Sequence, residues 1–189
     1  MGREWISCVI DTRDFATTTT YRSILLNNNC ILKSFLIIVA NNTEVGGGIG
    51  GTGLNSIITQ NRITKGKYGI NVDSDPLIHN NLVDHISSGI FAFNSNSIIR
   101  QNVIYTDPNS QSAVVAGIRL EAFNNSYSPT VDSNYIELNR RGEGIRKSFG
   151  TNPTINNNTF ILKHISTIGI WLSSSDSAKV YNNSIYAEE

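Results

Sequence analysis

Residues that form cross-links or bind metals are scarce in this sequence. Its 189 residues include two cysteines, three histidines and one methionine. Two cysteines in a chain of this length do not make a disulfide scaffold, and the histidines show no metal-ligand spacing. The sequence therefore predicts no bound metal or cofactor, with calcium at the short acidic run Asp73, Ser74 and Asp75 as the alternative.

An excess of one charge and a long apolar run are also missing. The 15 Lys and Arg residues balance the 15 Asp and Glu residues, so the basic footprint of a nucleic-acid-binding protein is absent. The most apolar run, "FLIIVA" at residues 35–40, is far shorter than the roughly 20 residues of a membrane span. The opening "MGREWISCVI" lacks the basic start and apolar stretch of a secretory signal. We expect neither nucleic acid nor a membrane span.

Isoleucine and asparagine are abundant instead, with 26 and 24 copies. Ile is a β-branched strand former and Asn suits tight turns. Two neighbouring segments also repeat each other, because Ile58, Asn61, Ile63, Gly69 and Ile70 return one repeat later as Ile78, Asn81, Val83, Gly89 and Ile90. All five positions move by the same interval, and a fixed interval of this size indicates a repeat architecture.

Two columns of this repeat continue along the chain. The Asn column contains Asn61, Asn81, Asn102, Asn134, Asn158 and Asn183, and the Gly column contains Gly48, Gly69, Gly89, Gly117, Gly144 and Gly169. Their intervals vary but never fall below about 20 residues, which suits a coil with a minimum perimeter plus insertions. Apolar residues alternate in short runs, without the i, i+3, i+4 stripe of a helix.

The columns predict an all-β solenoid, a parallel β-helix of about eight coils, in which two or three short strands of each coil stack on the next coil. We expect one domain over residues 1–189, with residues 1–23 as an edge or cap coil. The Asn ladder should adopt left-handed backbone geometry and bond from coil to coil, and the Gly column should face outward. The expected core is Ile58, Ile63, Ile70, Val72, Ile78, Val83, Ile90, Ile99, Ile104, Ile118, Leu120, Val131, Ile136, Ile145, Ile155, Ile170, Leu172, Val180 and Ile185.

Several repeats resemble a known superfamily. "SIITQNRI", "YGINV", "PTVDSNYI", "GEGI", "PTINNNTF" and "IGIW" are similar to the repeats of right-handed parallel β-helix proteins, the pectate-lyase-like superfamily. The resemblance covers about residues 24–186 and implies a right-handed β-helix. "ILKSFLIIVANNTEVGGGI" resembles a stretch of extracytoplasmic members. Since this fold hosts lyases, hydrolases and non-catalytic surface proteins, the resemblance does not decide the function.

Residues just after the Gly-Ile pairs give the candidate site. If each Ile faces inward, the residue after it faces outward, as does the residue two positions further on. The six candidate ligand-binding residues on this outward face are Phe91, Phe93, Arg119, Glu121, Arg146 and Trp171. Aromatic rings beside Arg and carboxylates suit a sugar-binding groove, although the same residues can simply pack under neighbouring loops. Lys147 departs from an otherwise apolar inward column, which puts the outward position of Arg146 in doubt.

Catalysis has less support than binding. Enzymes of the resembled superfamily use clustered acidic residues, whereas this face offers only Asp73 and Glu121, two coils apart at roughly 10 Å. We therefore expect a non-catalytic, extracytoplasmic module that binds a polysaccharide or another glycan, or serves as an adhesive face. The alternatives are a polysaccharide-active lyase or hydrolase and a structural segment of a larger surface or fibre assembly.

Three smaller patterns give further expectations. "GIGGTG" at residues 48–53 matches a dinucleotide motif, but the next repeat follows it instead of a helix, so we expect a turn between coils. The longest insertion, "YTDPNSQSAVVA", should form a loop beside the later coils. Cys8 and Cys30 are about one repeat apart, which predicts stacked neighbours on the Gly column with free thiols.

Overall fold

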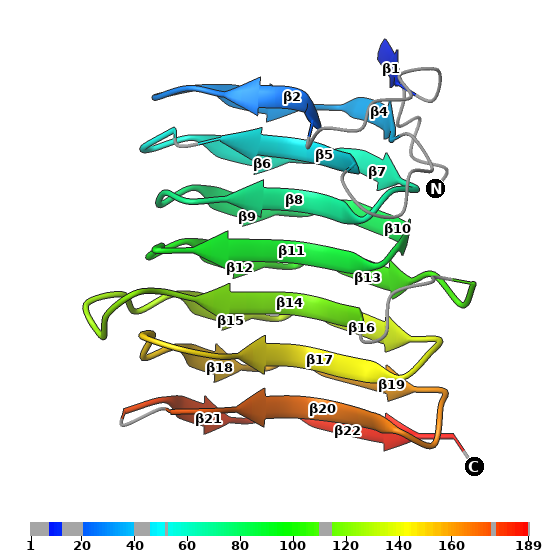
Figure 1. Ribbon diagram of the computed structural model, residues 1–189, viewed down its shortest axis with the longest axis vertical. Coiled ribbons are helices and arrows are strands. Elements are labelled where there is room, and N and C mark those ends of the chain that lie inside the picture. The colour runs from blue at the N-terminus through cyan, green and yellow to red at the C-terminus, as the bar shows by residue number, and fades with distance from the viewer. Residues whose placement is uncertain are drawn as a thin grey trace.

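The structure is a computed structural model that describes residues 8–12, 21–39, 46–51, 53–109, 115–174 and 177–188. Its described residues form 22 strands in three parallel sheets, stacked as successive coils (Figure 1). These stacked parallel strands are the parallel β-helix that the repeats predict. No helix among the described residues is long and apolar enough to cross a membrane.

Each coil contributes one short strand to each sheet. Sheet A contains β1 (Cys8–Asp11), β4 (Phe35–Ile38), β7 (Arg62–Thr64), β10 (Leu82–Ile86), β13 (Val103–Thr106), β16 (Tyr135–Leu138), β19 (Thr159–Leu162) and β22 (Ser184–Ala187). Sheet B contains β2 (Tyr21–Leu26), β5 (Gly46–Gly51), β8 (Tyr68–Val72), β11 (Ser88–Phe93), β14 (Val115–Glu121), β17 (Gly142–Lys147) and β20 (Thr167–Leu172). Sheet C contains β3 (Ile31–Lys33), β6 (Ile57–Thr59), β9 (Leu77–His79), β12 (Ile98–Arg100), β15 (Thr130–Asp132), β18 (Thr154–Asn156) and β21 (Lys179–Tyr181).

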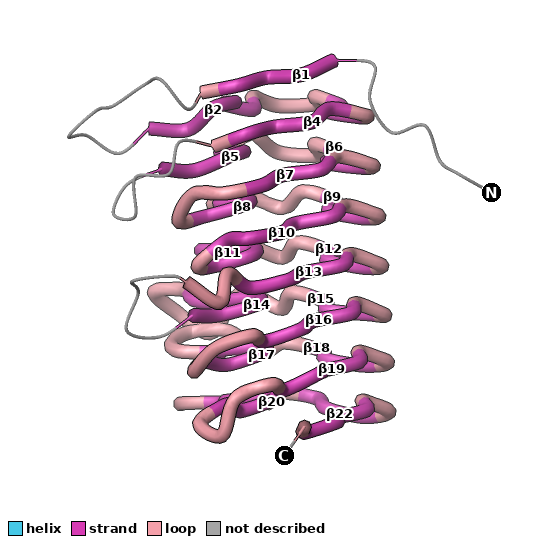
Figure 2. The backbone as a smooth tube through the Cα atoms, turned by 90° about the vertical axis from the view of Figure 1, so that its right-hand side faces the viewer, coloured by secondary structure: helices cyan, strands magenta, loops and turns pink. Residues whose placement is uncertain are grey.

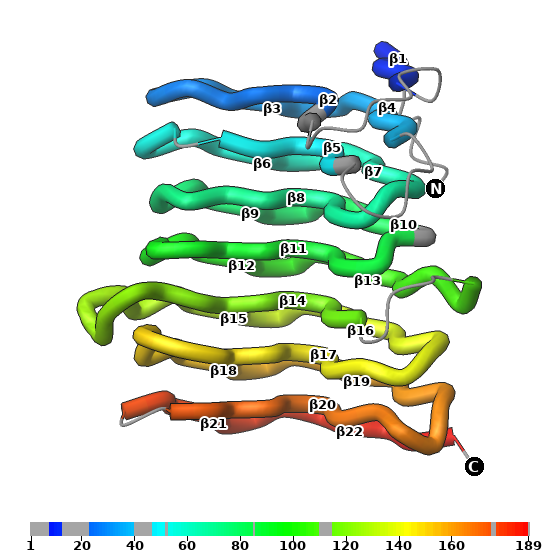
Figure 3. The backbone as a smooth tube through the Cα atoms, viewed as in Figure 1, coloured from blue at the N-terminus to red at the C-terminus, as the bar shows by residue number. Residues whose placement is uncertain are grey.

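The coils follow one another in chain order from the N-terminal end to the C-terminal end (Figure 3). In each sheet the strands of successive coils lie side by side, so the sheet extends along the length of the solenoid (Figure 2). The sheets have eight, seven and seven strands, so the number of complete coils is slightly below the predicted eight.

The core consists of the predicted isoleucine columns. Ile70, Ile90, Ile118 and Ile145 pair in register along sheet B and are fully buried. Three expected core residues are exposed instead, namely Leu172 at 39%, Val180 at 43% and Ile185 at 52%, and Ile170 is only partly buried. Their strands β20, β21 and β22 lie at the ends of their sheets and pair on one side only, so no further coil covers them.

A buried ladder of asparagines joins the coils at the corner between sheets C and A. Along Asn61, Asn81, Asn102, Asn134, Asn158 and Asn183, the backbone N–H and the side-chain amide of each Asn donate to the Oδ1 of the next at 3.0–3.1 Å. The prediction of bonds from coil to coil is confirmed. The left-handed backbone, however, belongs to the residue before each ladder Asn, such as Gln60, Asn80 and Gln101 (φ 55°, 56° and 55°). That residue makes the corner, and the Asn after it can then turn its amide inward.

The Gly column faces the interior, contrary to the outward position that strict alternation predicts. A Cβ built on Gly117 would lie 2.5 Å from Cγ2 of the buried Ile136 and 2.6 Å from the carbonyl oxygen of Gly144. Gly89 and Gly69 are equally close to core side chains. Glycine and the following isoleucine therefore both point into the core, because the strand departs from simple alternation at this position.

The cysteines do not stack on the Gly column. Cys8 lies on β1 of sheet A, where it pairs in register with Phe35, whereas Cys30 precedes β3 of sheet C. Both are free cysteines. The prediction was wrong because it assumed that an interval of about one repeat places two residues at the same position of neighbouring coils. The connections between strands vary in length, so the interval does not fix the position within a coil.

Candidate functional site

The candidate site lies on the outer side of sheet B. The predicted outward order is confirmed, because Asn71, Phe91, Arg119, Arg146 and Trp171 are register partners on successive strands β8, β11, β14, β17 and β20. Phe93 and Glu121 pair in the same way at the ends of β11 and β14. We call this surface the aromatic–arginine face and define it by Tyr68, Phe91, Phe93, Arg119, Glu121, Phe123, Glu143, Arg146 and Trp171.

Aromatic rings form a continuous chain over the first half of this face. The rings of Tyr68 and Phe91 are stacked with centroids 6.3 Å apart, and those of Phe91 and Phe93 are 6.1 Å apart. Phe93 then meets Phe123 edge to face at 4.9 Å. Phe123 is 84% exposed, so the chain of rings ends in an aromatic side chain that is open to solvent.

Two arginines lie against aromatic rings on the second half. The Arg119 guanidinium carbon is 5.0 Å from the centre of the Phe91 ring, and its Nε and Nη2 donate to Glu121 Oε1 at 2.7 and 2.6 Å. The Arg146 guanidinium carbon is 4.8 Å from the centre of the Trp171 ring. Arg146 also points outward, even though Lys147 beside it is fully buried, so Lys147 does not distort the face.

The side chain of Lys147 points inward like the others of its column, and its ammonium group is hydrogen-bonded where the chain leaves the next strand. Its ammonium group donates to the carbonyl oxygen of Ser173 at 2.8 Å and to that of Ser174 in the next coil. The long aliphatic stem occupies the space that Leu120 fills in the coil before it. A lysine can therefore replace an apolar residue here without turning the strand over.

Sequence reasoning missed Tyr68, Phe123 and Glu143. Tyr68 and Glu143 directly precede glycines of the Gly column, and simple alternation would place them inward. They face outward because the glycines themselves point inward. Phe123 lies in the connection after β14, where strand periodicity carries no information.

Glu143 is the most enclosed charged group on the face. Its side chain is 14% exposed, and its Oε2 has no hydrogen-bond partner and lies 3.9 Å from Arg146 Nη1. Burial raises the pKa of Glu143, while Arg146, Arg119 and Arg141 act in the opposite direction. The three arginines also make the surroundings of Glu143 net positive.

The smaller sequence patterns have structural roles. Residues 48–51 of the "GIGGTG" motif belong to strand β5, so this part of the motif is strand and not the predicted turn, and the next strands continue the solenoid. Both carboxylate oxygens of Asp75 receive hydrogen bonds from Asn96, from its backbone N–H and from its side-chain amide. The predicted long loop is described only in part, because residues 110–114 lie outside the described ranges.

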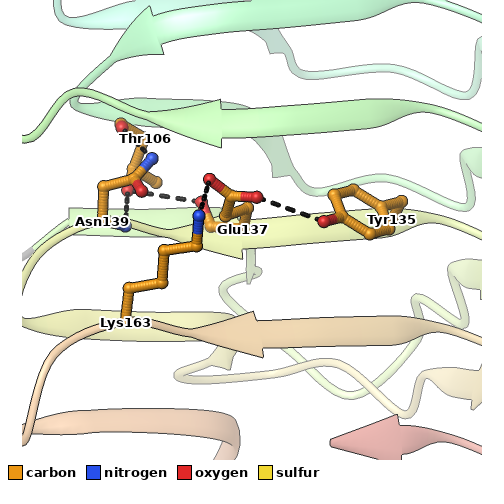
Figure 4. A network of polar contacts seen from close by, with 5 residues as sticks. All are labelled: Thr106, Tyr135, Glu137, Asn139 and Lys163. Atoms are coloured by element: carbon orange, nitrogen blue, oxygen red, sulfur yellow. Dashed lines mark hydrogen bonds and ion pairs between the residues drawn. The ribbon is translucent and has the colours of Figure 1, made fainter. Parts of the chain in front are cut away.

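A second polar group lies on the outer side of sheet A, away from the predicted residues (Figure 4). Glu137 accepts a hydrogen bond from the Tyr135 hydroxyl at 3.1 Å and forms an ion pair with Lys163 at 3.0 Å. Burial, followed by the Glu137 carboxylate, raises the pKa of Tyr135. Tyr135 and Glu137 lie on β16 and Lys163 follows β19, so this group links two neighbouring coils.

Comparison with known proteins identifies one family. The family described as "Periplasmic copper-binding protein (NosD)" matches residues 9–189. Searches of the curated proteins and of the solved structures gave no match.

The described residues do not fit a copper site. Copper in proteins is held by converging imidazole, thiolate or thioether groups, and the described part of the chain contains no cluster of three His, Cys, Asp or Glu residues. His79 Nδ1 lies 2.9 Å from the Asn80 amide nitrogen, and His164 Nδ1 accepts the Ser166 backbone N–H. Cys8 lies on sheet A, whereas Cys30 precedes a strand of sheet C, so these two thiols do not converge on one site.

Proposed function

Because the chain belongs to the NosD family, whose description is of periplasmic proteins, and carries the aromatic–arginine face, we propose that it is a non-catalytic extracytoplasmic module that binds acidic carbohydrate on that face. The observation that carries the proposal is the continuous row of aromatic rings and arginines along the strands of one sheet. Copper has no part in this proposal, because the described residues do not fit a copper site.

The chemistry of the face suits an acidic sugar chain. An aromatic side chain offers the apolar side of a sugar ring a surface to pack on, and exposed Phe123 provides such a surface. Arg119 and Arg146 are one-third exposed, and each keeps guanidinium N–H groups that can donate to a carboxylate or sulfate. Repetition of these groups from coil to coil matches a ligand that is itself a repeating polymer.

The carboxylates of the face support binding rather than cleavage. Glu121 is held by Arg119, and β11 lies between its strand β14 and the strand β8 that precedes Asp73. Two carboxylates in this arrangement do not flank a single glycosidic bond closely, as a retaining hydrolase requires. The enzyme alternative is nevertheless tested in the same experiment.

The test is binding to alginate, hyaluronan and chondroitin sulfate, with neutral dextran as the reference. Arg119→Ala, Phe123→Ala and Trp171→Ala should each weaken binding by about 1–3 kcal/mol, since central aromatic and arginine residues commonly contribute this much. Arg100→Ala on the outer side of sheet C is the matched control and should bind as the wild type does.

Three outcomes contradict the proposal. Absence of binding to every acidic polymer, together with loss of folding in the variants, would show that the face is packing in a structural rod. Equal loss in the Arg100→Ala control would show non-specific charge attraction. New unsaturated or reducing ends in the polymer, abolished by Asp73→Asn or Glu121→Gln, would establish an enzyme.

A further inference from the structure

A cavity of about 380 Å³ opens beside the aromatic–arginine face, where the chain passes from sheet A to sheet B in the last two coils. Its lining residues are Arg141, Gly142, Glu143, Ile165, Ser166, Thr167 and Ile168. The volume lies within the range of small-molecule sites, about 300–1,000 Å³. The cavity therefore accommodates a group the size of one or two sugar rings.

Glu143 brings a carboxylate to the cavity wall. Its Oε2 is enclosed and lies 3.9 Å from Arg146 Nη1, so a donor group of a ligand has to reach the other carboxyl oxygen, Oε1, in a side chain that is 14% exposed. A carboxylate in this position has lost much of its hydration, which is costly unless donors replace the water. Hydroxyl groups of a ligand are such donors.

The remaining walls combine apolar and polar surface. Ile165 is 95% exposed and Ile168 is 45% exposed, so the cavity has an apolar side. The Thr167 hydroxyl donates to the carbonyl oxygen of His164 at 2.7 Å, which leaves its oxygen free to accept. Arg141 adds an exposed guanidinium group. One apolar wall, the two hydroxyl side chains of Ser166 and Thr167 and one cation together match a pyranose ring that carries a carboxylate.

The cavity shares Glu143 with the aromatic–arginine face. Glu143 and Ile168 are separated by three positions from Arg146 and Trp171 on the same two strands, β17 and β20. Glu143 also forms its ion pair with Arg146. A sugar chain that lies on Trp171 can therefore place its neighbouring unit in the cavity.

We propose that this cavity is a subsite for one pyranose unit, held by hydroxyl donors to Glu143 and favouring an acidic sugar through Arg141. The proposal rests on the carbohydrate-binding function above and assigns it one pocket. The unit next to this subsite packs on Trp171, and the rest of the polymer follows the aromatic–arginine face.

The test uses glucose and glucuronate with the whole chain, measured by saturation-transfer NMR and calorimetry. The wild type should bind both sugars, with glucuronate bound about tenfold more tightly because a charge-assisted hydrogen bond adds roughly that factor. Glu143→Leu should weaken both sugars by about tenfold or more, and Arg141→Ala should remove the preference for glucuronate. Glu137→Leu is the matched control, since its side chain has the same 14% exposure but lies on sheet A.

The outcomes separate this proposal from the function on which it rests. No saturation transfer to either sugar, or wild-type affinity in Glu143→Leu, overturns the subsite even if polymers bind and Trp171→Ala weakens them. Conversely, loss of monosaccharide binding in Glu143→Leu, with polymer binding unaffected by Arg119→Ala and Trp171→Ala, supports the cavity and overturns the extended face.

Discussion

Replacing one central asparagine of the ladder should test how the coils are held together. In Asn102→Ala, the backbone N–H and the side-chain amide of Asn81 lose the Oδ1 that accepts both at 3.0 Å. The carbonyl oxygen of Ile78 and the Oδ1 of Asn134 each lose a donor. All these groups lie inside the solenoid, where water cannot replace the missing partner.

The size of the effect follows from these losses. A buried polar group left without its partner costs about 1–3 kcal/mol, and at least two groups are left poorly satisfied. We therefore expect Asn102→Ala to lower the free energy of unfolding by about 3–5 kcal/mol, which is large for a single substitution.

Asn183 at the other end of the ladder is the matched control. It accepts from Asn158 and donates to the carbonyl oxygens of Ile155 and Tyr181, yet it is only partly buried. Water can replace its bonds, so Asn183→Ala should cost about 1 kcal/mol. Guanidinium unfolding followed by circular dichroism measures both. Costs within about 1 kcal/mol of each other would refute the view that interior ladder bonds stabilise the stack.

The other predictions concern the Gly column, the buried lysine and the enclosed carboxylate. Gly117→Ala should destabilise by about 1–3 kcal/mol or prevent folding, because its Cβ would overlap Ile136; unchanged thermal stability would contradict the inward orientation. Lys147→Met should lower the free energy of unfolding by about 1–3 kcal/mol, because two carbonyl oxygens lose their donor. Lys147→Ala should lower it further because it also leaves a cavity. Equal losses in the two variants would show that the aliphatic stem of Lys147 is not packed. Since the pKa of Glu143 is raised above 4.5 in the folded protein, its ionisation costs stability above that folded pKa, and the cost vanishes as the pH falls below 4.5. Thermal unfolding should therefore show Glu143→Gln more stable than the wild type at pH 7 and no more stable near pH 4, and the reverse order would contradict burial as the dominant cause.

The sequence predicted most of the aromatic–arginine face but not its edges. Phe91, Arg119, Arg146 and Trp171 could be placed outward because each follows an isoleucine that must be buried, and a strand turns successive side chains to opposite sides. Tyr68 and Glu143 could not be placed in this way, because the strand departs from alternation at the following glycine. Phe123 lies in a connection between strands, where no period applies.

The repeat by itself determined the fold and the partners of the ladder. A short period, with Ile and Asn at fixed places in every unit, leaves stacked coils as the arrangement that buries most of the repeated isoleucines and pairs the amides of the ladder asparagines. Only the tertiary structure decided which way the Gly column points, which residue takes the left-handed turn and where the cysteines lie. These features depend on how closely one coil packs against the next and on the lengths of the insertions. The same holds for the cavity at Glu143, because its walls come from two coils whose approach is set by packing and not by sequence interval.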